Sequence, residues 1–217
     1  MSDLLADSPV THLVPEGRHG RPHGAPGVRA RVVDDLALAS LAARKDAAPA
    51  LGAAIRGAFG IDLPTGPKMA AGAEISLIGT APGRWLVLKD AARGADLLAR
   101  LTSVCGATAA LTDQSDANLV LELSGPQVGG VLEKLVALDL HPDVFRPGES
   151  AATMVALMSV LFWRLPDAEG GARYRFAVPR SFGPAFVRAL TAAAAPFGFD
   201  LAGTGTAGAP AGTHGRG

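Results

Sequence analysis

The sequence predicts an α+β fold built from two similar units, and three observations support this. A turn-forming block at residues 60–64 is followed by a strand-like segment and an Ala/Leu-rich helix, and the block at residues 137–142 is followed by the same order. Short alternating segments are interleaved with segments of helical period, which is typical of mixed folds. The 217 residues are 48% apolar, enough for one large domain or two smaller ones.

The first unit is expected over residues 28–114. Val28–Val32 alternates apolar and arginine residues, as a half-buried strand does. A helix is expected from Pro49, a residue tolerated in the first helical turn, to Gly60, which suits a left-handed helix end. The remaining elements are strands near residues 75–79, 85–88 and 108–111, a turn at 82–83 and a helix over 94–104.

The second unit, over residues 115–202, repeats this order. Its expected elements are a strand at 118–123, a helix capped by Ser124, an extended stretch at 153–164 broken near Ser159, a strand at 174–178, a helix capped by Ser181 that carries Phe182, and a strand at 197–201. Each unit then reads strand–helix–strand–strand–helix–strand. This order is the split βαβ, ferredoxin-like plan, with both helices on one face of the sheet.

Two flanking segments lack periodicity. Residues 1–27 are rich in Pro and Gly and are expected to be an irregular arm that orders on a partner, with arm histidines that are solvated or bind metal. Residues 203–217 are expected to be a disordered tail.

Composition argues against several classes of protein. Lysine plus arginine equals aspartate plus glutamate, 20 each, so the basic excess of a nucleic-acid-binding protein is absent. Cys105 is the single cysteine, which excludes a disulfide framework and favours a small core residue. No apolar run approaches the roughly 20 residues of a membrane span, and no signal peptide is apparent. We therefore expect a cytoplasmic protein without membrane or nucleic-acid partners.

Few residues suggest chemistry, and each has a structural alternative. Asp113 and Asp116 could act as paired carboxylates, or Asp113 and its neighbours could cap a turn. His141 could pair with Asp139 as a base, or lie at a helix end. Arg84 and Trp85 could bind a ligand by stacking, or Trp85 could anchor the core. Because no phosphate-loop, dinucleotide, zinc or triad motif is present, the residues alone predict no active site.

Four blocks in order resemble the gamma subunits of heterotetrameric sarcosine oxidases, within the aminomethyltransferase superfamily that includes the glycine-cleavage T-protein. They are Gly79-Thr80-Ala81-Pro82-Gly83-Arg84-Trp85-Leu86-Val87, Leu111-Thr112-Asp113-Gln114-Ser115, Leu138-Asp139-Leu140-His141-Pro142 and Val178-Pro179-Arg180-Ser181-Phe182. The resemblance covers about residues 28–200 and implies the folate-binding domain fold of that superfamily.

The resemblance also implies a function and partners. The chain would be a non-catalytic subunit that packs on the folate-binding region of an alpha subunit, beside beta and delta subunits. That assembly oxidises sarcosine to glycine and passes the methyl carbon to tetrahydrofolate. This chain would hold no cofactor, because FAD, FMN, NAD, tetrahydrofolate and zinc belong to the partners. Candidate partner-contact or structural residues are His12, Arg18, Arg84, Trp85, Asp113, Ser115, Asp139, His141 and Arg180.

One departure from the catalytic relatives bears on this reading. They carry an acidic residue in the extended stretch after the second unit's helix, whereas residues 154–165 here contain no carboxylate. Apolar side chains cannot steer protons or stabilise a cation, so the folate chemistry is expected to be lost. Three alternatives stay open: a subunit of a related dehydrogenase such as N-methylglutamate dehydrogenase, a stand-alone folate-binding aminomethyltransferase-like protein, and a regulatory domain that binds an amino acid.

Overall fold

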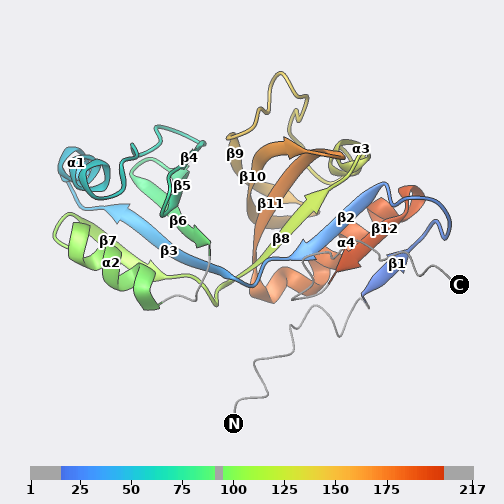
Figure 1. Cartoon of the computed structure of the whole chain (residues 1–217), viewed down its shortest axis with the longest axis horizontal. Coiled ribbons are helices and arrows are strands. Elements are labelled where there is room, and N and C mark those ends of the chain that lie inside the picture. Colours follow the sequence, from blue (N-terminus) through green and yellow to red (C-terminus); the bar gives the residue numbers. More distant parts are fainter. Residues whose placement is uncertain (1–15, 91–94, 203–217) are drawn as a thin grey trace, which may run out of the picture.

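The computed structural model describes residues 16–90 and 95–202, which form two β-sheets with helices packed on one face of each (Figure 1). The smaller sheet has five strands in the order β4-β5-β6-β3-β7, and the larger has seven in the order β1-β12-β2-β8-β11-β10-β9. This arrangement confirms the predicted α+β class. Among the described residues, no helix is long and apolar enough to cross a membrane.

The five-stranded sheet follows the split βαβ plan. Its strands are β3 (Leu36–Ala43), β4 (Met69–Ala71), β5 (Ser76–Ala81), β6 (Arg84–Asp90) and β7 (Ala109–Asp113), and its helices are α1 (Ala48–Phe59) and α2 (Ala95–Cys105). As predicted, α1 ends at Gly60, whose φ of 68° is the left-handed conformation that glycine adopts without strain. Cys105 is buried where α2 packs on the sheet, as expected for a core residue.

The sequence analysis missed β3, the strand between β6 and β7. Its sequence, LALASLAA, is dominated by good helix formers and shows no clear alternation. The reason is that both faces of β3 are covered. Ala39 and Leu41 pack against the helices, whereas Leu38 packs toward the other sheet. A strand buried on both sides reads as a continuous apolar run rather than an alternating one.

The seven-stranded sheet carries the larger core. Its strands are β1 (Gly17–His19), β2 (Val28–Val32), β8 (Asn118–Ser124), β9 (Ser150–Val155), β10 (Met158–Ala168), β11 (Gly171–Pro179) and β12 (Phe199–Ala202), with helices α3 (Val128–Leu132), α4 (Gly183–Ala194) and the 3₁₀ turns η2 (Arg180–Phe182) and η3 (Ala195–Phe197). Phe162 stacks on Phe145 and on Phe176, with ring centroids 5.1 Å apart in each pair. Phe186 of α4 contacts the last of these rings and so joins the helix to the sheet.

The strand Val28–Val32 forms where it was predicted but joins the other unit. It is β2, which lies between β12, its parallel neighbour, and β8, its antiparallel neighbour. The expectation that this strand opens the first unit was wrong, because alternation identifies a half-buried strand without identifying its partner. The chain crosses to the five-stranded sheet after β2 and returns between β7 and β8, as Figure 1 shows.

Part of the segment predicted to be an irregular arm forms a regular strand. Residues 17–19 form β1, which pairs antiparallel with β12. The backbone amides of Arg21 and Gly27 donate to the carbonyls of Ala195 and Phe197, at 3.2 and 3.0 Å. Residues 16–27 therefore lie on this chain's own sheet, whereas residues 1–15 and the predicted tail at 203–217 are outside the described residues.

Three local expectations in the second unit were also wrong. Ser124 is the last residue of β8 and caps no helix, since α3 begins after Gln127. Ser181 lies inside η2, and α4 has no side-chain cap. The extended stretch breaks at Ala156 and Leu157, which have φ angles of 47° and 68°, rather than at Ser159.

The two sheets meet through an apolar cluster between their helix-free faces. Leu38, Leu86 and Leu88 come from the five-stranded sheet, and Val120, Trp163 and Leu165 come from the seven-stranded sheet. This contact covers only part of each face. The part of the larger sheet that includes β2 and one end of β8 and β11 carries charged side chains instead.

Candidate functional site

A cluster of three arginines around one glutamate lies on the helix-free face of the seven-stranded sheet. Glu122 of β8 is directly opposite Arg31 of β2 on one side and Arg175 of β11 on the other. Residues alternate between faces along a strand, so the flanking Leu121 and Leu123 point to the helix-side core while Glu122 points away from it. The strands therefore place these three charged side chains on one face.

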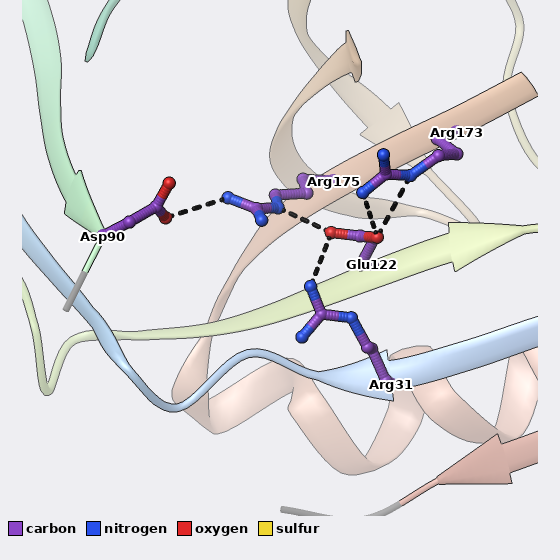
Figure 2. Close-up of polar contacts among 5 residues, drawn as sticks. All are labelled: Arg31, Asp90, Glu122, Arg173 and Arg175. Atoms are coloured by element: carbon purple, nitrogen blue, oxygen red, sulfur yellow. Dashed lines mark hydrogen bonds and ion pairs between the residues drawn. The ribbon is translucent and has the colours of Figure 1, made fainter. Parts of the chain in front are cut away.

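The glutamate accepts hydrogen bonds from all three arginines (Figure 2). Arg173 donates from Nε and Nη2 to Oε1, at 3.2 and 2.7 Å. Arg31 Nη2 and Arg175 Nε both donate to Oε2 at 2.9 Å. Nη1 of Arg175 also reaches Asp90, at the end of β6, at 3.4 Å, so the cluster connects the two sheets.

The cluster grades from a buried centre to an exposed rim. The side chain of Glu122 is 7% exposed and that of Arg175 is 14% exposed, whereas Arg173 and Arg31 are 29% and 44% exposed. Burial of the Glu122 carboxyl opposes its ionisation, but hydrogen bonds from Arg173 and Arg175 and the charges of Arg175 and Arg31 outweigh it. The pKa of Glu122 is therefore lowered.

The chemistry of these groups favours binding over catalysis. An ionised glutamate held by three arginines has no proton to give, and guanidinium groups do not deprotonate in proteins. Three positive charges surround one negative charge, so the four residues carry a net charge of two positive units. Each guanidinium has five N–H donors, and the bonds above use only some of them. The site can therefore attract and orient an anionic group.

A cavity of about 270 Å³ lies beside the cluster, between the two sheets. Arg173, Arg175 and Asp90 line it together with Trp163, which is fully buried. Within the described residues, Nε1 of Trp163 has no hydrogen-bond partner. The same part of the chain contains no group of three His, Cys, Asp or Glu side chains arranged to hold a metal ion.

The predicted residues Asp113, Ser115 and Arg180 lie near the chain's return to the larger sheet. The backbone amide of Ser115 donates to Asp113 Oδ1 at 2.9 Å, which is the turn geometry considered for this segment. The hydrogen bond from the Ser115 backbone amide, followed by that from its hydroxyl, lowers the pKa of Asp113. Oγ of Ser115 also accepts from the backbone amide of Leu38 at 3.1 Å. Arg180 Nε donates to the carbonyl of Asp116 at 2.8 Å. These contacts hold the crossover between the sheets.

Asp139 and His141 form a separate surface turn. Asp139 Oδ1 accepts from the backbone amide of His141 at 2.9 Å, and the His141 side chain instead lies near Asp143, with Nδ1 3.6 Å from Oδ2. The imidazole is 64% exposed. The sequence suggested that His141 could pair with Asp139 and act as a base. In the structure the two residues instead form an exposed turn, and none of the described hydrogen bonds joins the imidazole to a nucleophile.

The other predicted residues lie apart from both places. Arg84 is exposed at the start of β6, while Trp85 is 7% exposed and donates from Nε1 to the carbonyl of Pro64 at 2.9 Å, as a core anchor would. Arg18 donates to the carbonyls of Arg21 and Gly24 at 2.9 and 3.1 Å and so fixes that loop. His12 is outside the described residues. The structure does not gather the predicted residues into one site.

Sequence reasoning missed the arginine cluster, although a signal was present. Glu122 is the one charged residue within the apolar strand 118–123, and Arg31 and Arg175 occupy alternate positions of their strands. A charge in a strand that is otherwise buried needs a partner. What the sequence did not reveal was that β2 pairs with β8, which brings Arg31 to the cluster.

Comparison with protein families gives one match over most of the chain. The sarcosine oxidase gamma subunit family matches residues 44–196. The chain is 31% identical over 185 residues to the gamma subunit of sarcosine oxidase from Arthrobacter sp, which covers 83% of this chain and 85% of that one. It is 33% identical over 171 residues to the gamma subunit from Corynebacterium sp. (strain P-1), covering 75% and 79%.

Solved structures show the same architecture. A chain of the heterotetrameric sarcosine oxidase from Corynebacterium sp. U-96, in complex with pyrrole 2-carboxylate, matches with a TM-score of 0.73 and 26% identity, covering 89% of this chain and 96% of that one. The aminomethyltransferase T of the glycine cleavage system from Bartonella henselae matches with a TM-score of 0.57 and 15% identity, covering 81% and 48%. The second match concerns the fold alone and confirms the expected folate-binding-domain architecture.

Proposed function

This chain belongs to the sarcosine oxidase gamma subunit family, and on that premise we propose that it is a non-catalytic subunit of a heterotetrameric, flavin-dependent sarcosine oxidase. Its role in the assembly is to stabilise the alpha subunit by packing on the alpha subunit's folate-binding region. The assembly oxidises sarcosine to glycine and passes the methyl carbon to tetrahydrofolate. The observation that carries the proposal is the match to the heterotetrameric enzyme over 89% of this chain.

The extended stretch at residues 154–165 supports the non-catalytic role. It forms the end of β9, a two-residue turn and most of β10. Phe162 points into the helix-side core, and Trp163 and Leu165 point into the cluster between the sheets. These side chains fill space in two cores and present no carboxylate, so the stretch contributes packing where catalytic relatives place an acid.

The cofactors of the reaction belong to the partners in this proposal. FAD, FMN, NAD, tetrahydrofolate and zinc are assigned to the alpha, beta and delta subunits. The arginine cluster gathers four charged side chains on the helix-free face of the seven-stranded sheet. Its one carboxylate, Glu122, is already ionised and hydrogen-bonded to arginines. It suits contact with a partner rather than redox or folate chemistry.

Co-expression tests the proposal directly. The chain is produced with and without the alpha, beta and delta subunits, with an affinity tag on alpha. We expect this chain to co-purify with alpha in equal molar amount, and the assembly that lacks it to lose sarcosine oxidation on mild heating before the complete assembly does. The isolated chain should not oxidise sarcosine.

Two results would contradict the proposal. One is a chain that stays monodisperse alone and never co-purifies with the other subunits. The other is micromolar binding of tetrahydrofolate by the isolated chain that is lost in Arg84→Ala, which would favour a folate-binding protein instead.

A further inference from the structure

On the helix-free face of the seven-stranded sheet, charged side chains lie beyond the apolar cluster that joins the two sheets, and several of them are exposed. We call Arg29, Arg31, Arg173 and Arg175, arranged around Glu122, the arginine face. Arg29 is exposed and lies opposite Ser124, on the same side of the sheet as the others. Among the described residues no ion pair engages it. The helices α3 and α4 pack on the other side of this sheet.

We propose that the arginine face binds an acidic segment of a partner polypeptide, in which carboxylates pair with Arg29, Arg31 and Arg173. This inference rests on the proposed function for the identity of the partner, which is another subunit of the assembly. The chemistry that selects the segment is that of aspartate and glutamate side chains in an exposed loop.

The first support is the unbalanced charge. The four guanidinium groups of the arginine face meet the buried carboxylate of Glu122 and two acidic neighbours, Asp90, which pairs with Arg175, and Asp200, which lies beside Arg29 in register, so one net positive charge remains. The whole chain is neutral, with 20 basic and 20 acidic residues. A local positive surface on a neutral chain steers an acidic partner and fixes its register.

The second support is that the arginines are held in place before any partner arrives. Glu122 is nearly inaccessible and bonds to three of them. The guanidinium groups of Arg31 and Arg173 are each anchored by hydrogen bonds to Glu122. Even so, 44% of the Arg31 side chain and 29% of the Arg173 side chain remain exposed. Guanidinium groups form bidentate hydrogen bonds with carboxylates. Side chains that are already held in place lose less conformational entropy on binding than mobile ones do.

The third support is the position of Arg29 and Arg31 outside the neighbouring cavity. Arg29 and Arg31 lie on a sheet face rather than inside the neighbouring cavity, whose lining includes Arg173 and Arg175 but neither of them. Glu74, Asp90 and Asp167 also line that cavity and would repel a small anion. Exposed arginines on a sheet face outside the cavity therefore fit an extended acidic segment better than a buried phosphate or nucleotide.

The test removes two charges from the face and compares that variant with a matched control. Arg29→Gln with Arg31→Gln leaves Arg173 and Arg175 to hold Glu122. Arg56→Gln with Arg188→Gln removes the same net charge from the exposed sides of α1 and α4. Circular dichroism and melting first establish that both double variants are folded.

Dissociation of the chain from the co-expressed assembly is then measured at about 50 and 300 mM NaCl, which differ strongly in screening. We expect the face variant to bind about 30-fold more weakly than the unmodified chain at low salt, with a smaller salt dependence, and the control to stay within about twofold. Equal binding by both variants, or binding of the unmodified chain that does not respond to salt, overturns the proposal.

A second probe separates this inference from the proposed function. If the chain does not assemble with the other subunits, a fluorescent peptide of about eight glutamates is titrated into the isolated chain, with a glutamine peptide as reference. Binding that needs glutamates and is lost in the face variant alone supports the acidic-segment site even though the proposed function has failed. No binding of the glutamate peptide, or equal binding of the glutamate and glutamine peptides, refutes it.

Discussion

Replacing Glu122 with glutamine removes the negative charge at the centre of the arginine cluster while nearly preserving the size of the side chain. Removing one partner of a buried ion pair destabilises a protein by about 3–5 kcal/mol, because the remaining charge is left uncompensated. Glu122 and Arg175 are mostly buried, but Arg31 is 44% exposed and water can solvate it. We therefore expect Glu122→Gln to lower the free energy of unfolding by about 3 kcal/mol at pH 7.

The assay is thermal and urea unfolding followed by circular dichroism. For a chain of this length, about 3 kcal/mol corresponds to a fall in Tm of about 9 °C. Glu133→Gln is the control, because Glu133 is exposed and forms no described ion pair, and it should change stability by less than about 0.5 kcal/mol.

The pH dependence gives an independent check. The pKa of Glu122 is lowered from its ordinary value of 4.5, so its stabilising contribution is present above that value and is lost as the pH falls through the lower, folded-state pKa. The unmodified chain should therefore lose stability in acid more steeply than Glu122→Gln, and their difference should shrink below about pH 4. A loss below about 1 kcal/mol at pH 7, with parallel acid profiles, would refute this account of the cluster.

Three further substitutions test other parts of the fold by urea unfolding. Ala156→Asn with Leu157→Gly gives the β9–β10 turn the residues that suit its positive φ angles, and should stabilise the chain by about 1 kcal/mol; a loss would show that exposed Leu157 contributes packing. Phe162→Ala removes a fully buried ring that stacks on two others, and should destabilise by about 4 kcal/mol; less than about 2 would mean that the core collapses around the gap. Gly125→Ala puts a Cβ 2.5 Å from the carbonyl oxygen of Gly27 at a φ of 122°, and should destabilise by about 3 kcal/mol, whereas a neutral result would mean that the two segments separate easily.

Most elements could be predicted from the sequence because their signals are local. The period of α1 and its glycine stop, and the alternation of β2, are properties of a few neighbouring residues. The strand β3 could not be found in this way, since burial on both faces removes the alternation that marks a strand.

The candidate site was harder to predict because it depends on pairing between distant strands. Arg31 and Glu122 are 91 positions apart and meet only because β2 pairs with β8. Sequence motifs pointed instead to Asp113, Ser115 and Arg180, whose described contacts hold the crossover between the sheets. Their contact with a partner remains a prediction, as it does for the other candidate residues.

The position of β2 constrains the order in which the chain can fold. Its parallel neighbour β12 is the last strand described, so β2 must wait for residues 199–202 before its ladder is complete. The five-stranded sheet needs only residues 36–113 and can close earlier. During synthesis on the ribosome, the smaller unit would therefore form while β2 still lacks both of its sheet neighbours, β8 and β12, and β1 still lacks β12, and such unpaired strands are open to pairing with other chains. The arginines at alternate positions of β2 discourage that pairing through their mutual repulsion, before Glu122 has emerged to neutralise part of their charge.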